Sequence, residues 1–331
     1  MTARAPRLFL VTGGAGFIGS RIAAALAARG DDVVICDRLG QGEKWRNLEG
    51  FVFADLVDPD RCSDWLDRHH GALAGVVHMG AISATTVTDG DLVAERNLRF
   101  TRMLWDWCTE RHRPLIYASS AATYGDGSAG FEDEFGSAAL ARLRPLNLYG
   151  WSKHAFDRFV AREVERGRTT PPHWVGLKFF NVYGPGEWHK GSMMSVVSRN
   201  LRPVLAGEPI RLFRSTDPAW PDGGQVRDFV WVGDCVAMVL AALERPDISG
   251  LFNCGTGRAR TWMDLAHAIF AALGRDPRIE LIDMPASLAP RYQNFTQASM
   301  AQAAQAGLPV PATAIEDGVR ATVEALRRDL T

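Results

Sequence analysis

The N-terminal pattern of strand, glycine-rich turn, helix and strand constrains the fold more than any other part of the sequence. A continuous apolar run over residues 8–11 leads into the turn TGGAGFIG at residues 12–19, and a helix-like stretch follows over residues 20–29. A second apolar run, residues 33–36, ends at Asp37. Continuous apolar runs are typical of parallel strands that are buried on both faces. The order of elements therefore predicts an α/β fold with a doubly wound parallel sheet of the Rossmann type.

The glycines of this turn indicate a dinucleotide site. Gly13, Gly16 and Gly19 allow a tight turn, let backbone amides approach a pyrophosphate, and let the helix pack closely on the strand. The N-terminus of the following helix favours negative charge. A glycine pattern alone is a weak signal, but its place between a strand and a helix makes dinucleotide binding the expected function.

Charged residues near the second strand bear on the choice between NADP and NAD. Arg38 and Lys44 would suit the 2′-phosphate of NADP, whereas Asp37 would suit the ribose hydroxyl of NAD. The residues alone leave both cofactors open. Asp55, which follows a strand expected over residues 51–53, would suit an adenine amino group or would cap a helix.

Charge and cysteine content exclude several classes of protein. The chain has 331 residues and a net charge of -1, which gives no electrostatic case for binding nucleic acid or an anionic membrane. Its five cysteines are widely spaced and form no CxxC pair, so neither a disulfide framework nor a metal site is expected. No apolar run approaches the roughly 20 residues of a membrane span, and no signal peptide is recognisable. We therefore expect a cytoplasmic protein.

A tyrosine and a lysine four residues apart open a later helical run. The spacing places Tyr149 and Lys153 on one face of the helix, where an ammonium group would lower the phenol's pKa from about 10. Such a tyrosine can act as a general base. The spacing alone is weak, but Ser120 ends a strand expected over residues 114–118, where a hydroxyl faces the cofactor crevice and can hydrogen-bond a substrate oxygen.

Serine, tyrosine and lysine on a dinucleotide-binding sheet form the set used by short-chain dehydrogenases/reductases. The turn matches GxxGxxG and the tyrosine helix matches YxxxK, and the chain resembles the extended branch of that family over nearly its whole length. The resemblance implies tightly held NADP, with NAD as the alternative, and places Lys153 on the cofactor ribose. The further cofactor positions that it implies are Phe17, Ile18, Met79, Gly80, Ala81, Asn97 and Val182.

Several later motifs are similar to those of extended members that invert C6 of the heptose in ADP-heptose. They are SSAATYG at 119–125, NVYGP at 181–185, HKGSM at 189–193, RDFV at 227–230 and RYQNFTQ at 291–297. The resemblance implies that hydride leaves C6 and returns to its opposite face, with Tyr149 and Lys190 as two acid/base groups and Lys153 tuning the tyrosine. It also implies a homo-oligomer, a pentamer or larger ring. The substrate positions that it implies are Asn181, Ser192, Arg199, Phe213, Arg227 and Tyr292.

Other functions within and outside the family remain to be weighed. A nucleotide-sugar 4-epimerase of the UDP-glucose type would share Ser120, Tyr149 and Lys153 but would not need Lys190. A 4,6-dehydratase normally has an acidic pair where Ala121 and Ala122 stand. A redox-sensing regulator would have lost the tyrosine or the lysine. Met79, Pro59, Arg199 and the longer loop 216–224 depart from the heptose pattern, so the reaction type is better defined than the nucleotide and the sugar.

Lysine is rare in this chain. Only Lys44, Lys153, Lys178 and Lys190 occur among 37 basic residues, so each marks a candidate position for a cation that must be able to deprotonate, which arginine does not do in proteins. Lys178 has no matching role and is expected to be a cation at a strand edge. We expect residues 1–180 and 226–250 to form the cofactor domain, and 181–225 and 251–331 a smaller α/β substrate domain.

Overall fold

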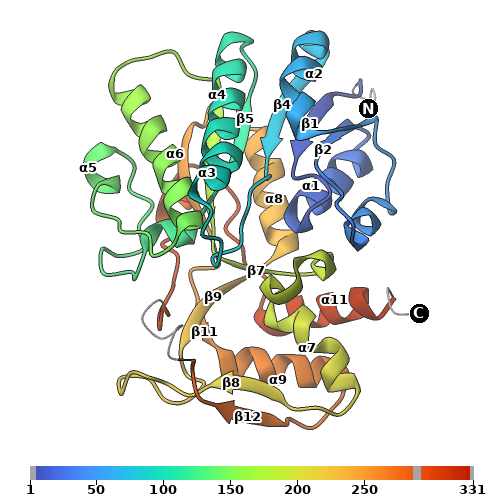
Figure 1. Ribbon diagram of the computed structural model, residues 1–331, viewed down its shortest axis with the longest axis vertical. Helices are drawn as coiled ribbons and strands as arrows, with labels where there is room; N and C mark the ends of the chain where they lie inside the picture. The colour runs from blue at the N-terminus through green and yellow to red at the C-terminus, as the bar shows by residue number, and fades with distance from the viewer. Residues whose placement is uncertain (1–4, 286–291, 329–331) are drawn as a thin grey trace.

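A seven-stranded sheet forms the centre of the protein in the computed structural model, which describes residues 5–285 and 292–328. The strand order is β10-β6-β5-β4-β1-β2-β3, and every neighbouring pair is parallel. The predicted fold class is therefore confirmed (Figure 1). The strands are β1 Leu8–Thr12, β2 Asp32–Cys36, β3 Asp55–Val57, β4 Leu73–His78, β5 Leu115–Ser120, β6 Trp174–Phe179 and β10 Gly250–Cys254.

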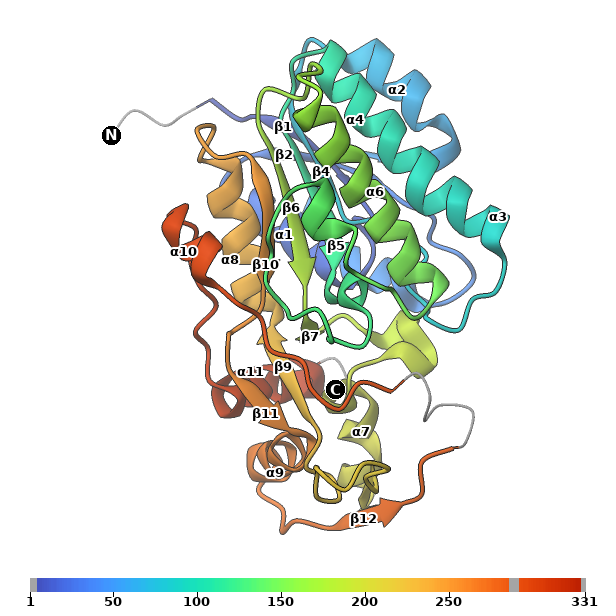
Figure 2. The same cartoon turned by 90° about the vertical axis from the view of Figure 1, so that its left-hand side faces the viewer.

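Helices cover both faces of this sheet, as Figure 2 shows. Side chains of β1 alternate between them: Phe9 and Val11 belong to the hydrophobic core under α1 and α8, and Leu10 to the core under α2, α4 and α6. Apolar residues on both sides explain why the strands read as unbroken apolar runs. The helices are α1 Phe17–Ala28, α8 Val232–Leu243, α2 Cys62–His69, α4 Phe100–Glu110 and α6 Leu148–Glu165.

A smaller part lies below the carboxyl ends of the strands in Figure 1. It contains a three-stranded sheet in the order β11-β9-β7 and a parallel pair of β8 and β12, with α7, α9 and α11 packed around a separate core. Its strands are β7 Asn181–Tyr183, β8 Ile210–Phe213, β9 Val226–Trp231, β11 Ala259–Thr261 and β12 Ile279–Ile282, and its helices are α7 Val196–Leu205, α9 Trp262–Leu273 and α11 Ile315–Arg328. None of the helices in the described residues combines the length and apolar character that a bilayer span requires.

The sheets cross the boundaries that the sequence suggested for the two domains. β10 begins at Gly250 and is hydrogen-bonded to β6, so a boundary after residue 250 cuts a strand of the large sheet. β9 pairs with β7 and β11 and not with the large sheet. The division into domains itself stays a prediction. The strand expected over residues 51–53 was wrong, because the chain bends there and pairs with β2 only from Asp55 onward.

Lys178 does not lie at a sheet edge, so that expectation was wrong. It lies on β6, between β5 and β10, with a side chain that is 1% exposed. Its Nζ donates to Thr123 Oγ1 at 2.8 Å and lies 3.6 Å from a carboxylate oxygen of Asp157, which also accepts a hydrogen bond from Ser119 Oγ at 2.6 Å. Lys178 is thus the partner of a buried acid beneath the carboxyl end of β5, a pairing that only the packing of α6 on β6 creates.

Replacing Lys178 by methionine should destabilise the fold strongly. The substitution leaves Asp157, which is fully buried, without its cation, and breaking a buried pair in this way costs about 3–5 kcal/mol. Urea unfolding followed by circular dichroism would measure the loss. Arg99→Ala is the matched control, because its pair with Glu95 is exposed and its loss should cost less than about 1 kcal/mol. Equal losses in both variants would contradict the assignment of a buried pair.

Candidate active site

A cavity of about 1180 Å³ opens between the carboxyl ends of the large sheet and the smaller part. It gathers residues from the glycine turn, the ends of three strands, the tyrosine helix and the 3₁₀ segment η5, Trp188–Met193. Most of the predicted site residues line it: Gly13, Gly16, Phe17, Ile18, Gly19, Asp37, Lys44, Met79, Gly80, Ala81, Ser120, Tyr149, Lys153, Asn181, Val182, Lys190, Ser192, Arg199, Arg227 and Tyr292. The residues predicted to bind the cofactor and those predicted to bind the substrate therefore line one cavity.

Two predicted cofactor residues point to other partners. Arg38 is paired with Asp60, and its guanidinium lies 3.4 Å from Asp58. Asp55 accepts a hydrogen bond from Trp65 Nε1 at 2.9 Å. Neither residue is among those that line the cavity, and their contact with a cofactor stays a prediction.

Two further predicted residues lie behind the cavity wall. Asn97 is fully buried, and its amide exchanges hydrogen bonds of 2.8 and 2.9 Å with the backbone of Ile82 and donates to Ser152 Oγ at 3.0 Å. It thereby fixes the loop after β4 to the tyrosine helix. Phe213 packs its ring against that of Tyr292, with centroids 6.3 Å apart, and so supports a residue that does line the cavity. Their direct roles in binding stay predictions.

The glycine turn has the shape that a pyrophosphate needs. Gly13 has a φ of +64°, and a Cβ there would lie 2.6 Å from the backbone of Gly80. A Cβ on Gly19 would overlap the carbonyl oxygen of Gly13, so the helix packs on the turn only because glycine stands there. The N-cap residue of α1 is Gly16, so no side chain occupies the amides of the first turn, and that turn holds no acidic residue. These features leave the helix N-terminus able to receive an anion.

Asp37 joins the turn to the segment that carries Lys44. One carboxylate oxygen accepts a hydrogen bond from the amide of Ala15 at 2.9 Å, and the other accepts from Lys44 Nζ at 2.6 Å and from the amide of Arg38 at 2.7 Å. Lys44 Nζ also donates to the carbonyl oxygen of Arg38 at 3.1 Å. Since a lysine offsets the charge of Asp37, the acid alone does not exclude a 2′-phosphate at this position.

Helix α6 delivers the predicted tyrosine and lysine to the end of β5. Asn147 caps the helix by accepting a hydrogen bond from the amide of Gly150 at 2.8 Å. Lys153 is almost completely buried, and its Nζ donates to the carbonyl oxygen of Ala118 at 2.8 Å. Ser120 lies two residues further along β5, so serine, tyrosine and lysine meet at the carboxyl edge of the sheet, as the sequence predicted.

The pKa values of this group differ from the expected pattern. Burial raises the pKa of Tyr149, and the carboxylate of Asp157 adds to the rise, while the hydroxyl of Ser120 lowers it. The expected lowering by Lys153 was wrong, because its ammonium is directed to the carbonyl oxygen of Ala118. Burial lowers the pKa of Lys153 itself to about 8, against an opposing effect of Asp157.

If Tyr149 and Lys153 take part in the reaction, its rate should change near pH 8 as Lys153 loses its proton. Because its pKa is lowered to about 8, Lys153 is protonated below that pH and neutral above it, and a plot of kcat/KM against pH, which reports the pKa values of the free enzyme, should bend there. Lys153→Arg keeps the charge but does not titrate, so the bend should disappear. Initial rates measured at a series of pH values would show whether the bend is present. An unchanged bend in the arginine variant would assign the proton to another group.

Lys190 lines the same cavity from a different segment of the chain. It lies in η5, and its Nζ lies 3.1 Å from a carboxylate oxygen of Glu187 and 5.0 Å from the ring centroid of Phe17. Its side chain is 24% exposed. The two predicted acid/base groups thus come from different walls: Tyr149 from the α6 side and Lys190 from the segment that follows β7.

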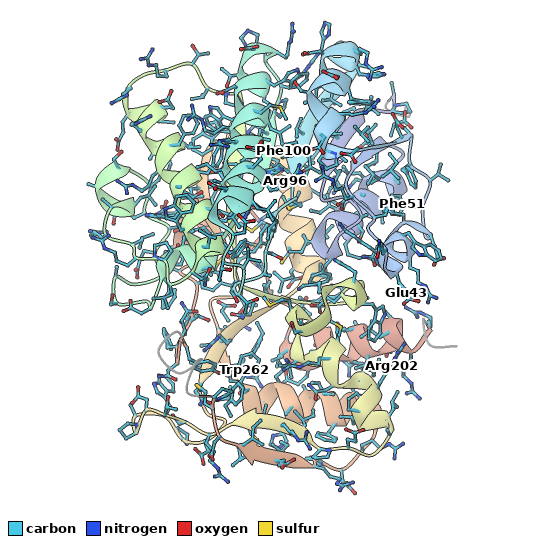
Figure 3. The ribbon with its side chains drawn as sticks, in the orientation of Figure 1. Glu43, Phe51, Arg96, Phe100, Arg202 and Trp262 are labelled. Carbon is cyan, nitrogen blue, oxygen red and sulfur yellow. The ribbon has the colours of Figure 1, made fainter. Side chains whose placement is uncertain are left out.

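Arg227 lies on β9 between two aromatic rings. Its side chain is buried, and its Cζ lies 4.9 Å from the ring centroid of Tyr292 and 5.6 Å from that of Trp262. Burial lowers the pKa of this guanidinium. Trp262, labelled in Figure 3, begins α9 in the lower part of the molecule. Its Nη1 donates to the carbonyl oxygen of Val226 at 2.8 Å, and within the described residues no carboxylate is found among the groups that act on Arg227. A ligand anion can therefore take its remaining donors.

Sequence reasoning missed Asn47 and Glu187. The side-chain amide of Asn47 donates to the carbonyl oxygens of Ala15 and Gly186, each at 3.0 Å, and so ties the glycine turn to the chain just before η5. Nothing in the local sequence marks Asn47. Glu187 stands three residues before Lys190, a spacing that allows contact within a helical turn and could have drawn attention to it.

The fold and the site together define a dinucleotide-dependent enzyme with a serine, tyrosine and lysine set. A family model described as "NAD dependent epimerase/dehydratase family" matches residues 9–255, and the chain belongs to this family. The resemblance drawn from the motifs is confirmed at this level.

Within that family, the chain is similar to proteins named ADP-L-glycero-D-manno-heptose-6-epimerase. It is 49% identical over 317 residues to the one from Nitratidesulfovibrio vulgaris (strain DP4), covering 94% of this chain and 95% of the relative. It is 44% identical over 322 residues to the one from Alkalilimnicola ehrlichii, covering 96% of this chain and 97% of the relative.

Solved structures agree with this placement. The Helicobacter pylori ADP-L-glycero-D-manno-heptose-6-epimerase matches with a TM-score of 0.78 and 26% identity over 99% of both chains. The Thermus thermophilus UDP-glucose 4-epimerase complex with NAD matches with a TM-score of 0.74 and 29% identity over 97% of this chain and 99% of that one.

Proposed function

We propose that this protein inverts C6 of the heptose in ADP-D-glycero-D-manno-heptose to give the L-glycero epimer, by transient oxidation and re-reduction. The observation that carries the proposal is the presence of Tyr149 and Lys190 on different walls of one cavity that also holds the glycine turn. Relatives at 49% and 44% identity are named for this reaction. The product would serve lipopolysaccharide core synthesis in the cytoplasm, and the enzyme would work as a homo-oligomer.

The cofactor of this reaction is a nicotinamide dinucleotide, for which we propose NADP. When bound, it supplies acceptance and return of a hydride. Gly13, Gly16 and the N-terminus of α1 would hold its pyrophosphate, and Lys153 its ribose. Lys44, which already neutralises Asp37, would face the 2′-phosphate. NAD is the alternative, and the Thermus structure is a complex with NAD.

Inversion requires proton transfer to and from the C6 oxygen in two orientations of the sugar, whereas a one-way oxidation requires it in one. The C6 oxygen loses its proton in one orientation and regains it after the aldehyde has turned its other face to the cofactor. A single base on one wall serves only one orientation. Tyr149 acts in one orientation, with Ser120 donating to the same oxygen, and Lys190 acts in the other.

The rest of the substrate must stay in place while the aldehyde turns. Arg227 offers donors for the diphosphate, since a guanidinium pairs with phosphate oxygens in a fork. The rings of Tyr292 and Trp262 on either side hold this guanidinium by cation–π contacts. Asn181, Ser192 and Arg199 line the cavity between this anchor and the proton-transfer groups, where they would contact the sugar.

An assay with two nucleotide sugars tests the proposed reaction. Incubation with ADP-D-glycero-D-manno-heptose should give inversion at C6, visible by NMR, while UDP-galactose should remain unchanged. Denaturing the same preparation should release NADP. Conversion of UDP-galactose in place of the heptose would favour the 4-epimerase, which has the same serine, tyrosine and lysine but no need of Lys190.

Loss of either proton-transfer group should abolish inversion. Tyr149→Phe and Lys190→Met should each lower kcat by about 10²–10⁴-fold, the usual contribution of a positioned acid/base group, while the bound cofactor is retained. Glu280→Gln, which alters an exposed ion pair with Arg211 outside the cavity, serves as the control. Full activity of Lys190→Met would refute the two-group scheme and leave Tyr149 as the sole base.

A further inference from the structure

We infer that Glu187 is the positioning residue for Lys190 and that it fixes the ammonium for its half of the inversion. This inference rests on the proposed function, because it assumes that Lys190 transfers a proton. Glu187 itself is fully buried and is not among the residues that line the cavity, so it acts on the substrate only through Lys190.

The surroundings of Glu187 are built to hold a carboxylate. One oxygen accepts hydrogen bonds from Ser195 Oγ at 2.6 Å and Ser198 Oγ at 3.0 Å. The other accepts from the amide of Ser195 at 2.8 Å and from Lys190 Nζ at 3.1 Å. All four partners are donors, the set that suits an ionised carboxylate. The site also lies at the N-terminus of α7, whose dipole favours negative charge.

This carboxylate joins the two sides of a chain segment that faces the substrate. The amide of Lys190 donates to the backbone oxygen of Glu187 at 2.8 Å, so the acid holds both ends of the lysine. Between its partners Lys190 and Ser195 lies Gly191, with a φ of +54°, and then Ser192, which lines the cavity. Glu187 therefore contacts both sides of this turn. A glutamine at this position keeps an acceptor oxygen for the serine hydroxyls and loses the charge that pairs with Lys190.

Other charges near Lys190 do not replace Glu187. Lys44 and Asp37, which face the neighbouring His189, are bonded to each other at 2.6 Å. Within the described part of the chain, the pair with Glu187 is the one ion pair found for Lys190. Its other contact is the Phe17 ring, 5.0 Å from Nζ. A long, flexible lysine side chain therefore has one charged group that determines where its ammonium lies.

Oxidation of each epimer can be measured separately, and comparing the two distinguishes a role of Glu187 in positioning Lys190 from a role in stabilising the fold. The holoenzyme is mixed with each epimer in turn, and formation of reduced nicotinamide is followed by absorbance. Lys190→Met should slow oxidation of one epimer, and Tyr149→Phe oxidation of the other. Oxidation of the epimer that depends on Lys190 moves the hydroxyl proton onto the Lys190 amine, and Glu187 pairs with the ammonium that forms. We therefore expect Glu187→Gln to slow oxidation of the same epimer as Lys190→Met by about 10- to 100-fold, as loss of a charged hydrogen bond does, and oxidation of the other epimer by less than about twofold.

The scarcity of lysine provides a readout that does not depend on activity. Lys153 and Lys178 are buried, so an acylating reagent followed by mass spectrometry reports mainly on Lys190 and Lys44. Release of its ammonium in Glu187→Gln should raise the acylation rate of Lys190 by about tenfold, while Lys44, held by Asp37, stays as the internal reference.

Two further variants test the role of Glu187. Glu280→Gln makes the same exchange of carboxylate for amide at an exposed ion pair with Arg211 on β8 and β12, outside the cavity, so both half-reactions should stay within about twofold of the parent. If Glu187→Gln does not fold, Glu187→Asp, which withdraws the charge by one methylene, should slow the same epimer.

The outcomes distinguish failure of this inference from failure of the proposed function. Unchanged half-reactions and unchanged labelling in Glu187→Gln, or equal slowing of both epimers, would overturn the role of Glu187 while the enzyme still inverts C6. A parent enzyme that does not act on ADP-heptose would overturn the proposed function, and the labelling of Lys190 would still test the contact with Glu187.

Discussion

The close approach of two backbones at the ends of β1 and β4 is the constraint on which the site depends. The amide of Met79 donates to the carbonyl oxygen of Thr12 at 3.0 Å, and that of Gly80 to the Thr12 hydroxyl at 3.3 Å. Gly13 follows directly, with no room for a Cβ against Gly80. The turn that begins at this contact leads into α1 at Phe17, and the Phe17 ring lines the cavity 5.0 Å from Lys190 Nζ.

Lys178, Lys153 and Lys190 have different surroundings. Lys178 balances Asp157 in the core, Lys153 is buried against a backbone carbonyl with a lowered pKa, and Lys190 is held by a buried carboxylate at the cavity wall. The burial and the partner decide between these roles. The same kind of side chain is a structural counter-ion in one place and the proposed proton-transfer group in another.

Sequence reasoning succeeded where function depends on residues that lie close in the chain. Residues 12–19 require glycine at fixed positions, and Tyr149 and Lys153 share one helical face, so local geometry alone placed them. It failed where a contact joins distant segments. Lys178 was assigned to an edge because β10, which pairs beside β6, comes from a part of the chain far from it in sequence. The lowered pKa expected for Tyr149 failed because burial outweighed a neighbour whose ammonium is directed elsewhere.

The sequence by itself determined the parallel sheet, the dinucleotide turn and the pairing of Tyr149 with Lys153 on one helix, because each depends on periodicity or on residue spacing within a short stretch of chain. Ser120 was placed beside them because the carboxyl ends of parallel strands lie at one edge of the sheet. The motif at 189–193 also marked Lys190, though only by resemblance. Tertiary structure alone decided that Lys190 faces the same cavity as Tyr149 and that Glu187 holds it, since both follow from how η5 packs between the glycine turn and α7. Which side chains from distant segments face one cavity depends on the tertiary fold of the whole chain, and a local sequence pattern does not specify it.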